Sequence, residues 1–485
     1  MQQGDSNIKN KVLSGLLWKF SERMGSQIIT FIISVILARI LGPEEYGAIA
    51  IIMVFITISN VLITNGFSTA LIQKNDVSTK DFSSAFYLNV IVGIILYLVL
   101  FFSAPIISDF YKMDVLVPTI RVLSLIVPIM GVNSIQQAYV SRNMLFKRFF
   151  FSTLIGTGVS GILGIVMAYK GFGIWALVFQ YLSNNLINAI VLWFTVNWRP
   201  TKEFSIRHVK DLFSYGWKLL CAGLLDNGYS QLRSLLIGKM YSGEDLAYYN
   251  RGQQYPQLVV TNINTSISSV LFPALSRSQG NTKSVKAYTR RAIQVSSYIM
   301  WPVMAGLGVC AEPIVRIMLT DKWLPCVPYL QIACFTYGIW PIHTANLEAL
   351  KAMGRSDLFL KLEIIKKSIG MVVLLATIPF GVMTMAMSAI WVSIISAFVN
   401  AWPNRKILSY SYIEQMKDML PSMCLSAVMI AVVFPLKFVV LNDWLLLFLQ
   451  AVLGIIVYLL GSILLKIDGF MFVLNIAKKM IGERK

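Results

Sequence analysis

The chain has 485 residues, of which 56% are hydrophobic and only 13% are charged, and its mean hydropathy is +0.67. Soluble proteins carry about twice that share of charged residues, so the composition excludes a soluble multidomain enzyme and favours a protein that lies mostly in lipid. The net charge of +19 does not indicate nucleic-acid binding, because the basic residues are spread over short loops and form no single patch.

Hydropathy along the chain predicts an all-α polytopic membrane protein with about fourteen transmembrane helices, each long enough to cross a bilayer. The predicted spans lie near 13–40, 46–72, 82–107, 115–141, 150–169, 174–196, 212–237, 246–275, 292–314, 325–350, 359–378, 384–402, 419–436 and 445–465. The first span carries internal charge and is too long for a cleavable signal peptide, so we expect it to remain as a membrane anchor. The connecting loops are too short for a soluble domain.

Lys and Arg alternate between loops: the N-terminus and every second loop are rich in them, and the other loops nearly lack them. The positive-inside rule therefore predicts that both termini are cytoplasmic. The five cysteines show no paired spacing and are interpreted as small hydrophobic residues.

A weak internal repeat runs through the chain in the same order in both halves. LARILGPEEYGA from Leu37 aligns with IGKMYSGEDLAY from Ile237, and Trp18-Lys19 aligns with Trp217-Lys218. Six spans per repeat predict two six-helix lobes related by a pseudo-twofold axis along the membrane normal, with a site between them. The predicted divisions are an N-terminal lobe at 1–198, a C-terminal lobe at 199–410, and two extra helices with a cytoplasmic tail at 411–485.

Polar side chains recur at helical spacing inside the most apolar segments, and this pattern carries the functional argument. The stripe of the first span consists of Lys19, Glu22, Arg23, Ser26, Gln27, Thr30 and Ser34. Spans two, seven and eight carry similar stripes, which include Asn60, Asn227 and Gln254. A polar face inside a membrane helix must point at protein or water, so these helices are predicted to line an aqueous cavity. The alternative for the uncharged positions is interhelical hydrogen bonding.

Cations outnumber acids among the deeply placed charges. The deep set is Lys19, Glu22, Arg23, Arg121, Asp226, Arg233 and Arg251. A surplus of positive charge at membrane depth is explained by an anionic substrate that enters and leaves, and the Arg fork suits phosphate oxygens. The lone carboxylate Asp226, beside Asn227, is a candidate coupling site for a proton or a sodium ion; the alternative is an ion pair with Arg233 or another cation.

The sequence contains no Gly-rich phosphate loop, no HExxH and no CxxC pair, so it supports neither an ATPase nor a zinc site. We expect no metal and no cofactor, and the energy source would be an ion gradient or the substrate gradient itself.

Several stretches resemble bacterial polysaccharide exporters of the Wzx type. These are SGLLWKFSERMGSQIITFIISVILARILGPEEYGAIAI from Ser14, GFSTALIQKNDVSTKDFSSAFYLN from Gly66, GFGIWALVFQ from Gly171 and LFPALSRSQG from Leu271. The resemblance covers essentially the whole chain and implies membership in the multidrug/oligosaccharidyl-lipid/polysaccharide (MOP) exporter superfamily. It also implies two six-helix lobes around a V-shaped cavity, with two helices added in the lipid-carrier flippases.

The resemblance further implies a flippase that moves undecaprenyl-pyrophosphate-linked oligosaccharide from the inner to the outer leaflet. In the related lipid II flippases, basic residues of the first and eighth helices meet the pyrophosphate, and Lys19, Arg23 and Arg251 occupy matching places. An acid of their seventh helix can couple sodium, which Asp226 matches by helix only. The predicted substrate-binding residues are Lys19, Arg23, Arg251, Arg121, Arg233, Glu22, Gln27, Asn60 and Gln254.

The main hypothesis is therefore a multi-pass flippase of the bacterial inner membrane that works by alternating access in surface polysaccharide export, such as that of O-antigen or capsule. Its partners would be the lipid-linked oligosaccharide, the bilayer, and the polysaccharide polymerase and chain-length machinery. One alternative is a membrane enzyme of glycan assembly, a polymerase or transferase. The other is a cation-coupled exporter of small molecules, which the positive cavity and the two extra spans disfavour.

Overall fold

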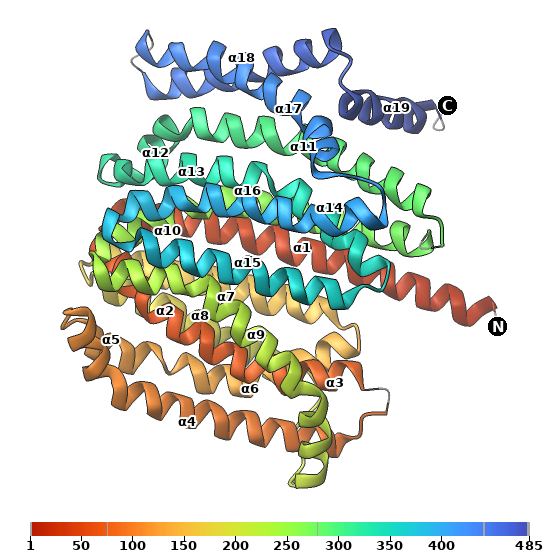
Figure 1. The fold of residues 1–485 in the computed structure, drawn as a ribbon. Coiled ribbons are helices and arrows are strands. Elements are labelled where there is room, and N and C mark those ends of the chain that lie inside the picture. The colour runs from red at the N-terminus through yellow and green to blue at the C-terminus, as the bar shows by residue number, and fades with distance from the viewer. Residues whose placement is uncertain (1, 75, 279, 440–441, 483–485) are drawn as a thin grey trace. The chain divides into compact units, whose positions relative to one another are not determined.

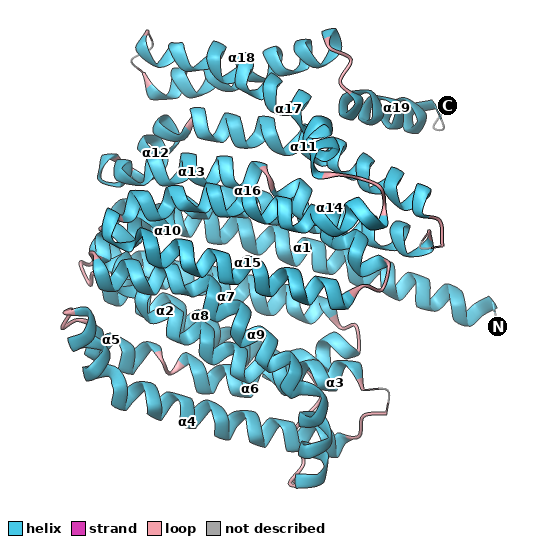
Figure 2. Ribbon diagram, viewed as in Figure 1, coloured by secondary structure: helices cyan, strands magenta, loops and turns pink. Residues whose placement is uncertain are grey.

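The computed structural model describes residues 2–74, 76–278, 280–439 and 442–482. Helices account for nearly all of this part of the chain, and no strand occurs in it (Figure 2). The chain divides into two compact units, with the boundary between Ala247 and Tyr248. The predicted all-α architecture is thus confirmed.

Unit 1 contains ten helical elements and the first turn of an eleventh. Their bounds are α1 (Gln2–Ile40), α2 (Pro43–Ile63), the π-helix η1 (Thr64–Ser68), α3 (Thr69–Gln73), α4 (Thr79–Tyr111), α5 (Leu116–Leu123), α6 (Ile126–Arg142), α7 (Phe146–Tyr169), α8 (Ile174–Thr195) and α9 (Ile206–Met240), followed by the start of α10 (Gly243–Arg277) (Figure 1).

Unit 2 continues α10 and runs to the last helix. Its further elements are α11 (Thr282–Val309), α12 (Ala311–Leu319), η2 (Asp321–Cys326), α13 (Val327–Gly338), α14 (Trp340–Ala352), α15 (Ser356–Thr377), η3 (Ile378–Phe380), α16 (Val382–Ile407), α17 (Tyr412–Val433), η4 (Phe434–Phe438), α18 (Asp443–Leu464) and α19 (Asp468–Gly482).

Each of the fourteen predicted spans falls on a helix or on consecutive helices, but the count of fourteen stays a prediction. Eleven helices of the described chain are long and apolar enough to cross a membrane. The other three predicted spans fall on α9, on α13 with α14, and on α15. Helices α9 and α15 carry several Lys and Arg residues, which lowers their hydropathy. Helices α13 and α14 are each short, because the tenth predicted span is divided.

Two of the predicted spans are broken in the middle, and proline explains both breaks. The fourth span divides into α5 and α6, and the tenth divides into α13 and α14. Pro128 and Pro341 occupy the first turns of α6 and α14. Proline lacks the N–H that would continue the preceding helix, whereas it is tolerated in a first turn, so the chain restarts the helix there.

The aligned segments of the internal repeat begin their helices in the same way. At the start of α2, the Glu45 carboxylate accepts a hydrogen bond of 2.8 Å from the Gly42 N–H. At the start of α10, the Asp245 carboxylate accepts bonds from the Ser242 N–H (3.3 Å) and hydroxyl (2.7 Å). An acid in the first turn satisfies an otherwise free N–H and complements the helix dipole. This local likeness supports the repeat, while the symmetry of whole lobes stays a prediction.

Small residues let the helices of unit 1 approach closely. A Cβ atom added to Gly161 of α7 would lie 2.0 Å from Ile33 Cδ1 of α1, and one added to Gly164 would lie 2.8 Å from Gln180 Cβ of α8. Lipid tails are as apolar as the side chains, so close packing replaces the hydrophobic effect as the force that joins membrane helices.

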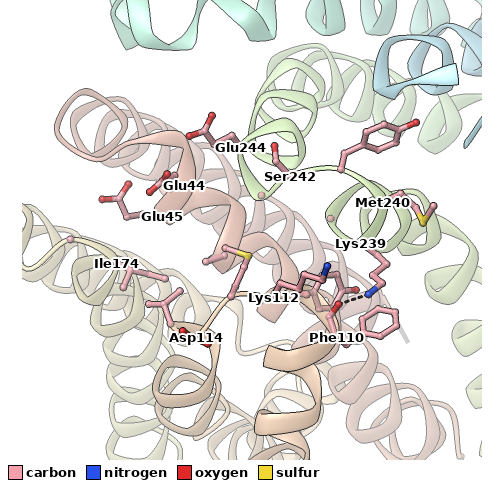
Figure 3. A pocket seen from close by; sticks show the side chains of 18 of the residues that line it. Glu44, Glu45, Phe110, Lys112, Asp114, Ile174, Lys239, Met240, Ser242 and Glu244 are labelled. Carbon is pink, nitrogen blue, oxygen red and sulfur yellow. Dashed lines mark hydrogen bonds between the residues drawn. The ribbon is translucent and has the colours of Figure 1, made fainter. Parts of the chain in front are cut away.

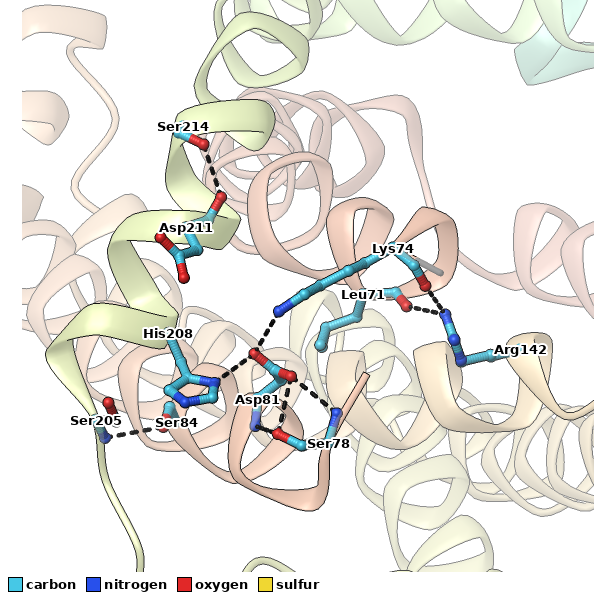
Figure 4. A network of polar contacts seen from close by, with 10 residues as sticks. All are labelled: Leu71, Lys74, Ser78, Asp81, Ser84, Arg142, Ser205, His208, Asp211 and Ser214. Carbon is cyan, nitrogen blue, oxygen red and sulfur yellow. Dashed lines mark hydrogen bonds and ion pairs between the residues drawn. The ribbon is translucent and has the colours of Figure 1, made fainter. Parts of the chain in front are cut away.

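The segment that follows α8, together with the beginning of α9, is tied to the end of α3 and the beginning of α4 (Figure 4). Asp81, whose side chain is 2% exposed, accepts bonds at one carboxylate oxygen from Lys74 Nζ (2.9 Å) and pairs there with His208 Nδ1 (2.7 Å). Nearby, the Ser205 N–H donates to Ser84 Oγ at 3.0 Å. These contacts hold the start of α9 in unit 1.

Helix α9 packs against α2, η1 and α4 along its length, which is why the compact unit reaches Ala247. The predicted division into 1–198, 199–410 and 411–485 follows helix number along the chain and stays a prediction.

Unit 2 has a buried polar network inside its apolar core. Asn346 of α14 donates from Nδ2 to Gln415 Oε1 of α17 at 2.7 Å, and Asn404 of α16 donates to Asn346 Oδ1 at 2.6 Å. All three side chains are fully buried. Interhelical amide bonds of this kind join three helices where water is absent, which is the role that the sequence left open for uncharged polar positions.

Candidate functional site

The polar stripe of α1 lies on the half-buried face of that helix. The opposite face is apolar and is 39–66% exposed; it consists of Leu17, Phe20, Met24, Ile28 and Ile32. Apart from the exposed Lys19 and Thr30, the side chains of the stripe are half-buried within unit 1. An apolar exposed face suits lipid, and a polar face set apart from it is the arrangement expected of a helix beside a hydrated space.

Within the stripe, Lys19 and Glu22 are brought together. Lys19 Nζ lies 2.8 Å from Glu22 Oε2, one helical turn away. The Lys19 side chain is 50% exposed and that of Glu22 is 12% exposed. One acid of the stripe is therefore already engaged by one cation.

Arg23 has no carboxylate partner among the residues that the structure describes. The structure shows no ion pair between Arg23 and any residue that it describes, and the side chain is half-buried. Its backbone carbonyl accepts a hydrogen bond from Ser26 Oγ at 3.1 Å. Counted together, Lys19, Glu22 and Arg23 give the stripe two cations and one acid.

An aromatic wall from α7 lies beside these cations, and sequence reasoning missed it. Lys19 Nζ lies 5.0 Å from the centre of the Phe149 ring, and the Trp18 and Phe150 rings meet edge to face at 5.1 Å. Lys147 Nζ lies 5.5 Å from the Trp18 ring. The signal was present as the cluster FKRFFF at the start of α7, but period and hydropathy treat that stretch as an ordinary span end. Aromatic faces stabilise cations at low solvent exposure.

On α9, the candidate coupling residues lie beside the π-helix. Asn227 Nδ2 donates to the Gly223 carbonyl at 2.9 Å, and the neighbouring Asp226 side chain is exposed. A Cβ atom on Gly223 would lie 2.2 Å from Asn65 Nδ2 of η1, so α9 and η1 are in close contact there. Asp226 and the half-buried Arg233 both have further polar interactions. Ion coupling at Asp226 stays a prediction, which the dependence of transport on a sodium or proton gradient would test.

Arg251 of α10 is a packed residue of unit 2. It is 4% exposed, its Nη1 donates to Gln254 Oε1 at 2.7 Å, and its guanidinium carbon lies 4.9 Å from the Trp323 ring centre. The structure therefore shows Arg251 bonded to Gln254 and packed against Trp323. A role in substrate binding stays a prediction.

Arg121 lies away from the stripe, on the short helix α5. Its guanidinium carbon is 4.6 Å from the centre of the Phe101 ring of α4, and no acid of the described chain pairs with it. Gln27 and Asn60 are half-buried on α1 and α2, and the Asn60 carbonyl accepts a bond of 2.8 Å from Thr64 Oγ1. No cluster of His, Cys, Asp and Glu that could hold a metal ion occurs among the residues described.

The chain belongs to the family described as polysaccharide biosynthesis protein, whose model matches residues 36–328. It is 25% identical over 359 residues to the teichuronic acid biosynthesis protein TuaB of Bacillus subtilis, which is 73% of each chain. It is 23% identical over 374 residues to the lipopolysaccharide biosynthesis protein WzxC of Escherichia coli, which is 74% of each chain.

Two solved structures share its fold. The lipid II flippase MurJ, in an inward closed conformation, aligns with a TM-score of 0.75 and 17% identity over 93% of this chain and 99% of its own. An inward-facing multidrug resistance MATE family transporter of the MOP superfamily aligns with a TM-score of 0.61 and 14% identity over 85% of this chain and 98% of its own. At this identity the likeness concerns the fold alone.

These comparisons confirm the predicted likeness to Wzx-type proteins and the predicted membrane fold, while membership in the MOP superfamily stays a prediction. They also place the chain in a family of polysaccharide biosynthesis proteins, as the sequence predicted. The individual site residues are tested by none of them and stay predictions.

Proposed function

We propose that this protein is a flippase that carries an undecaprenyl-pyrophosphate-linked oligosaccharide from the inner to the outer leaflet of a bacterial inner membrane by alternating access. Both termini would lie in the cytoplasm, as the alternation of basic loops predicts. The family of polysaccharide biosynthesis proteins and the fold shared with a lipid II flippase support this substrate class. The proposal involves no cofactor, and a proton or sodium ion would couple transport.

The observation that carries the proposal is the unpaired charge on α1. Glu22 pairs with Lys19, whereas Arg23 has no acid partner among the described residues. A cation at the centre of a membrane helix costs at least about 2.5 kcal/mol on insertion scales, so an uncompensated one indicates an anionic ligand. The pyrophosphate would be that ligand, because the planar guanidinium binds two phosphate oxygens at once.

The remaining parts of the substrate follow from their chemistry. The glycan would occupy hydrated space and bond to amide side chains such as Gln27 and Asn60, while the prenyl tail would stay in lipid. Arg233 and Arg121 would contribute positive potential, and the contact of Arg251 with the pyrophosphate stays a prediction. A polysaccharide polymerase and chain-length machinery would receive the flipped unit.

A leaflet assay in a deletion strain tests the proposal. Complementation with the wild type should place the lipid-linked oligosaccharide where a membrane-impermeant reagent reaches it in spheroplasts. Replacing Lys19 and Arg23 together with Ala should lower that fraction at least about tenfold, since two charge-assisted contacts are lost. Lys170→Ala, which removes an exposed cation at the end of α7, is the matched control and should restore export.

Full restoration by the double variant, present at normal levels in the membrane, would show that the cations of α1 do not bind the substrate. Repeat units that reach the outer face of the deletion strain, but are not polymerised, would instead show an enzyme that acts after translocation.

A further inference from the structure

A cavity of about 1110 Å³ lies at the end of unit 1 where α2, α8 and α10 begin and α4 and α9 end (Figure 3). Three segments that stand out in the sequence converge on it: GPEEYG from Gly42, the start of its repeat partner SGEDLAY from Ser242, and the start of GFGIW from Gly171. The cations of α1 lie far from the end of that helix at Ile40, because Lys19 and Ile40 are about 30 Å apart at ~1.5 Å per residue. The role proposed for these cations therefore does not explain the convergence.

Close backbone contacts form the wall of this cavity. A Cβ atom on Gly47 of α2 would lie 2.0 Å from the Gly243 carbonyl oxygen of α10, so the two helix starts touch without side chains between them. Gly173, with φ of +52°, turns the chain into α8 beside Glu45. Such close contacts restrict the backbone, so the charged side chains that line the cavity are attached at fixed positions.

The lining is acidic and its carboxylates are available. Figure 3 shows Glu44, Asp114 and Glu244 around the cavity, and none of these three side chains makes an ion pair or hydrogen bond with the part of the chain that the structure describes. Lys239, by contrast, is engaged: its Nζ donates to the Phe110 carbonyl at 2.5 Å and lies 3.9 Å from the ring centre. Lys112 is the second cation of the lining, so two lysines stand against the four carboxylates of Glu44, Glu45, Asp114 and Glu244, and the lining is net negative.

A pyrophosphate does not suit such a lining, because like charges repel and the four carboxylates outnumber the two lysines. Hydroxyl groups do fit, since each can donate to a carboxylate, and a charge-assisted bond is stronger than a neutral one. Tyr111 and Tyr241 add aromatic surface with polar tips, and the volume suits a ligand of several rings.

We propose that this cavity binds the saccharide part of the transported substrate, an inference that rests on the proposed function. The two ends of unit 1 then differ in the part of the substrate that they recognise. The cations of α1 bind the pyrophosphate, and the acidic cavity binds hydroxyl-rich sugar while repelling phosphate. The positive-inside pattern puts the cavity on the outer side, where weak attraction for pyrophosphate favours release.

Binding of a lipid-free sugar to the full-length protein in nanodiscs tests the inference. The probe is the oligosaccharide released by mild acid from the surface polysaccharide of the source strain, with inorganic pyrophosphate as the second probe. The triple variant Glu44→Gln, Asp114→Asn and Glu244→Gln should bind the oligosaccharide at least about tenfold more weakly, because charge-assisted acceptors become neutral amides. Its affinity for pyrophosphate and its melting temperature should be those of the wild type.

The matched control is Asp76→Asn, Glu203→Gln and Asp211→Asn, which removes three exposed acids of unit 1 outside the cavity and should leave sugar binding unchanged. Equal oligosaccharide affinity in the pocket variant and the wild type would overturn the inference, as would failure of the wild type to bind the sugar. Displacement of the sugar by pyrophosphate in the wild type but not in the Lys19 and Arg23 double variant would overturn it too, because both probes would then share the α1 site. The leaflet assay tests the proposed function by itself. A negative result for sugar binding at this cavity therefore does not contradict the proposed function.

Discussion

At the scale of single residues, the predicted cations prove to be unlike one another. Lys19 is paired with Glu22, Arg23 has no acid partner among the described residues, and Arg251 is packed over Trp323. All three looked equivalent in the sequence, because spacing places a residue on a helix face but does not say which neighbour that face meets. The three cations therefore differ in their surroundings, which their positions in the sequence do not reveal.

Arg251 provides a residue-scale prediction. Arg251→Ala should lower the free energy of unfolding by about 2–4 kcal/mol, because a buried side chain, a charge-assisted bond to Gln254 and a cation–π contact are lost together. Arg251→Met fills much of the same volume without a buried charge and should recover most of that stability. Thermal unfolding of the purified protein measures both.

The same pair of variants separates packing from transport. A stable Arg251→Met protein that flips substrate normally would restrict Arg251 to packing, and a stable one that does not flip would support its predicted contact with pyrophosphate. Wild-type stability of Arg251→Ala would contradict the packing described here.

At the scale of elements, close helix contacts are made where glycine removes the side chain. Gly252 of α10 faces α13 so closely that an added Cβ atom would lie 2.7 Å from Tyr329 Cβ and 2.8 Å from the Leu330 nitrogen. Hydropathy located these helices, but it carries no information on which glycine meets a neighbouring backbone. The breaks at Pro128 and Pro341 were likewise visible as residues, yet a proline in a membrane span can also be accommodated as a kink.

Gly252→Ala tests the packing of α10 on α13. The new methyl group has no room against the backbone of the start of α13, so we expect a loss of about 1–3 kcal/mol in the free energy of unfolding. Gly306→Ala is the matched control on α11, because nothing lies within 4 Å of its added Cβ atom. That change should be neutral or stabilise by up to about 1 kcal/mol. Equal melting temperatures for the two variants would refute the close contact.

At the scale of the whole molecule, the chain divides into two compact units after the first turn of α10, at Ala247. Asp81, Lys74 and His208 hold the first turns of α9, and α2, η1 and α4 hold the rest. The boundaries of a sequence repeat and the boundaries of a compact unit need not coincide, because a helix can pack against segments outside its own repeat.

Asp81→Asn tests this attachment. The neutral amide loses the charge-assisted bonds to Lys74 and His208, which should weaken the attachment by about 1–3 kcal/mol. Amide hydrogen exchange over residues 199–215 should then be faster by about tenfold, because local opening becomes easier. Asp76→Asn, an exposed acid nearby, should leave exchange there unchanged. Unaltered protection in Asp81→Asn would mean that the helix contacts of α9 alone hold this segment.

Sequence by itself determined the membrane class, the helical positions, the polar face of α1 and the family kinship, because hydropathy, helical period and motif order are properties of local residues. Only the tertiary structure decided that Glu22 forms an ion pair with Lys19, that the Phe149 ring lies beside Lys19, and that Arg251 is buried. It also brought GPEEYG, GFGIW and SGEDLAY to one acidic cavity. These facts depend on contacts between residues far apart in the chain, which no local pattern encodes.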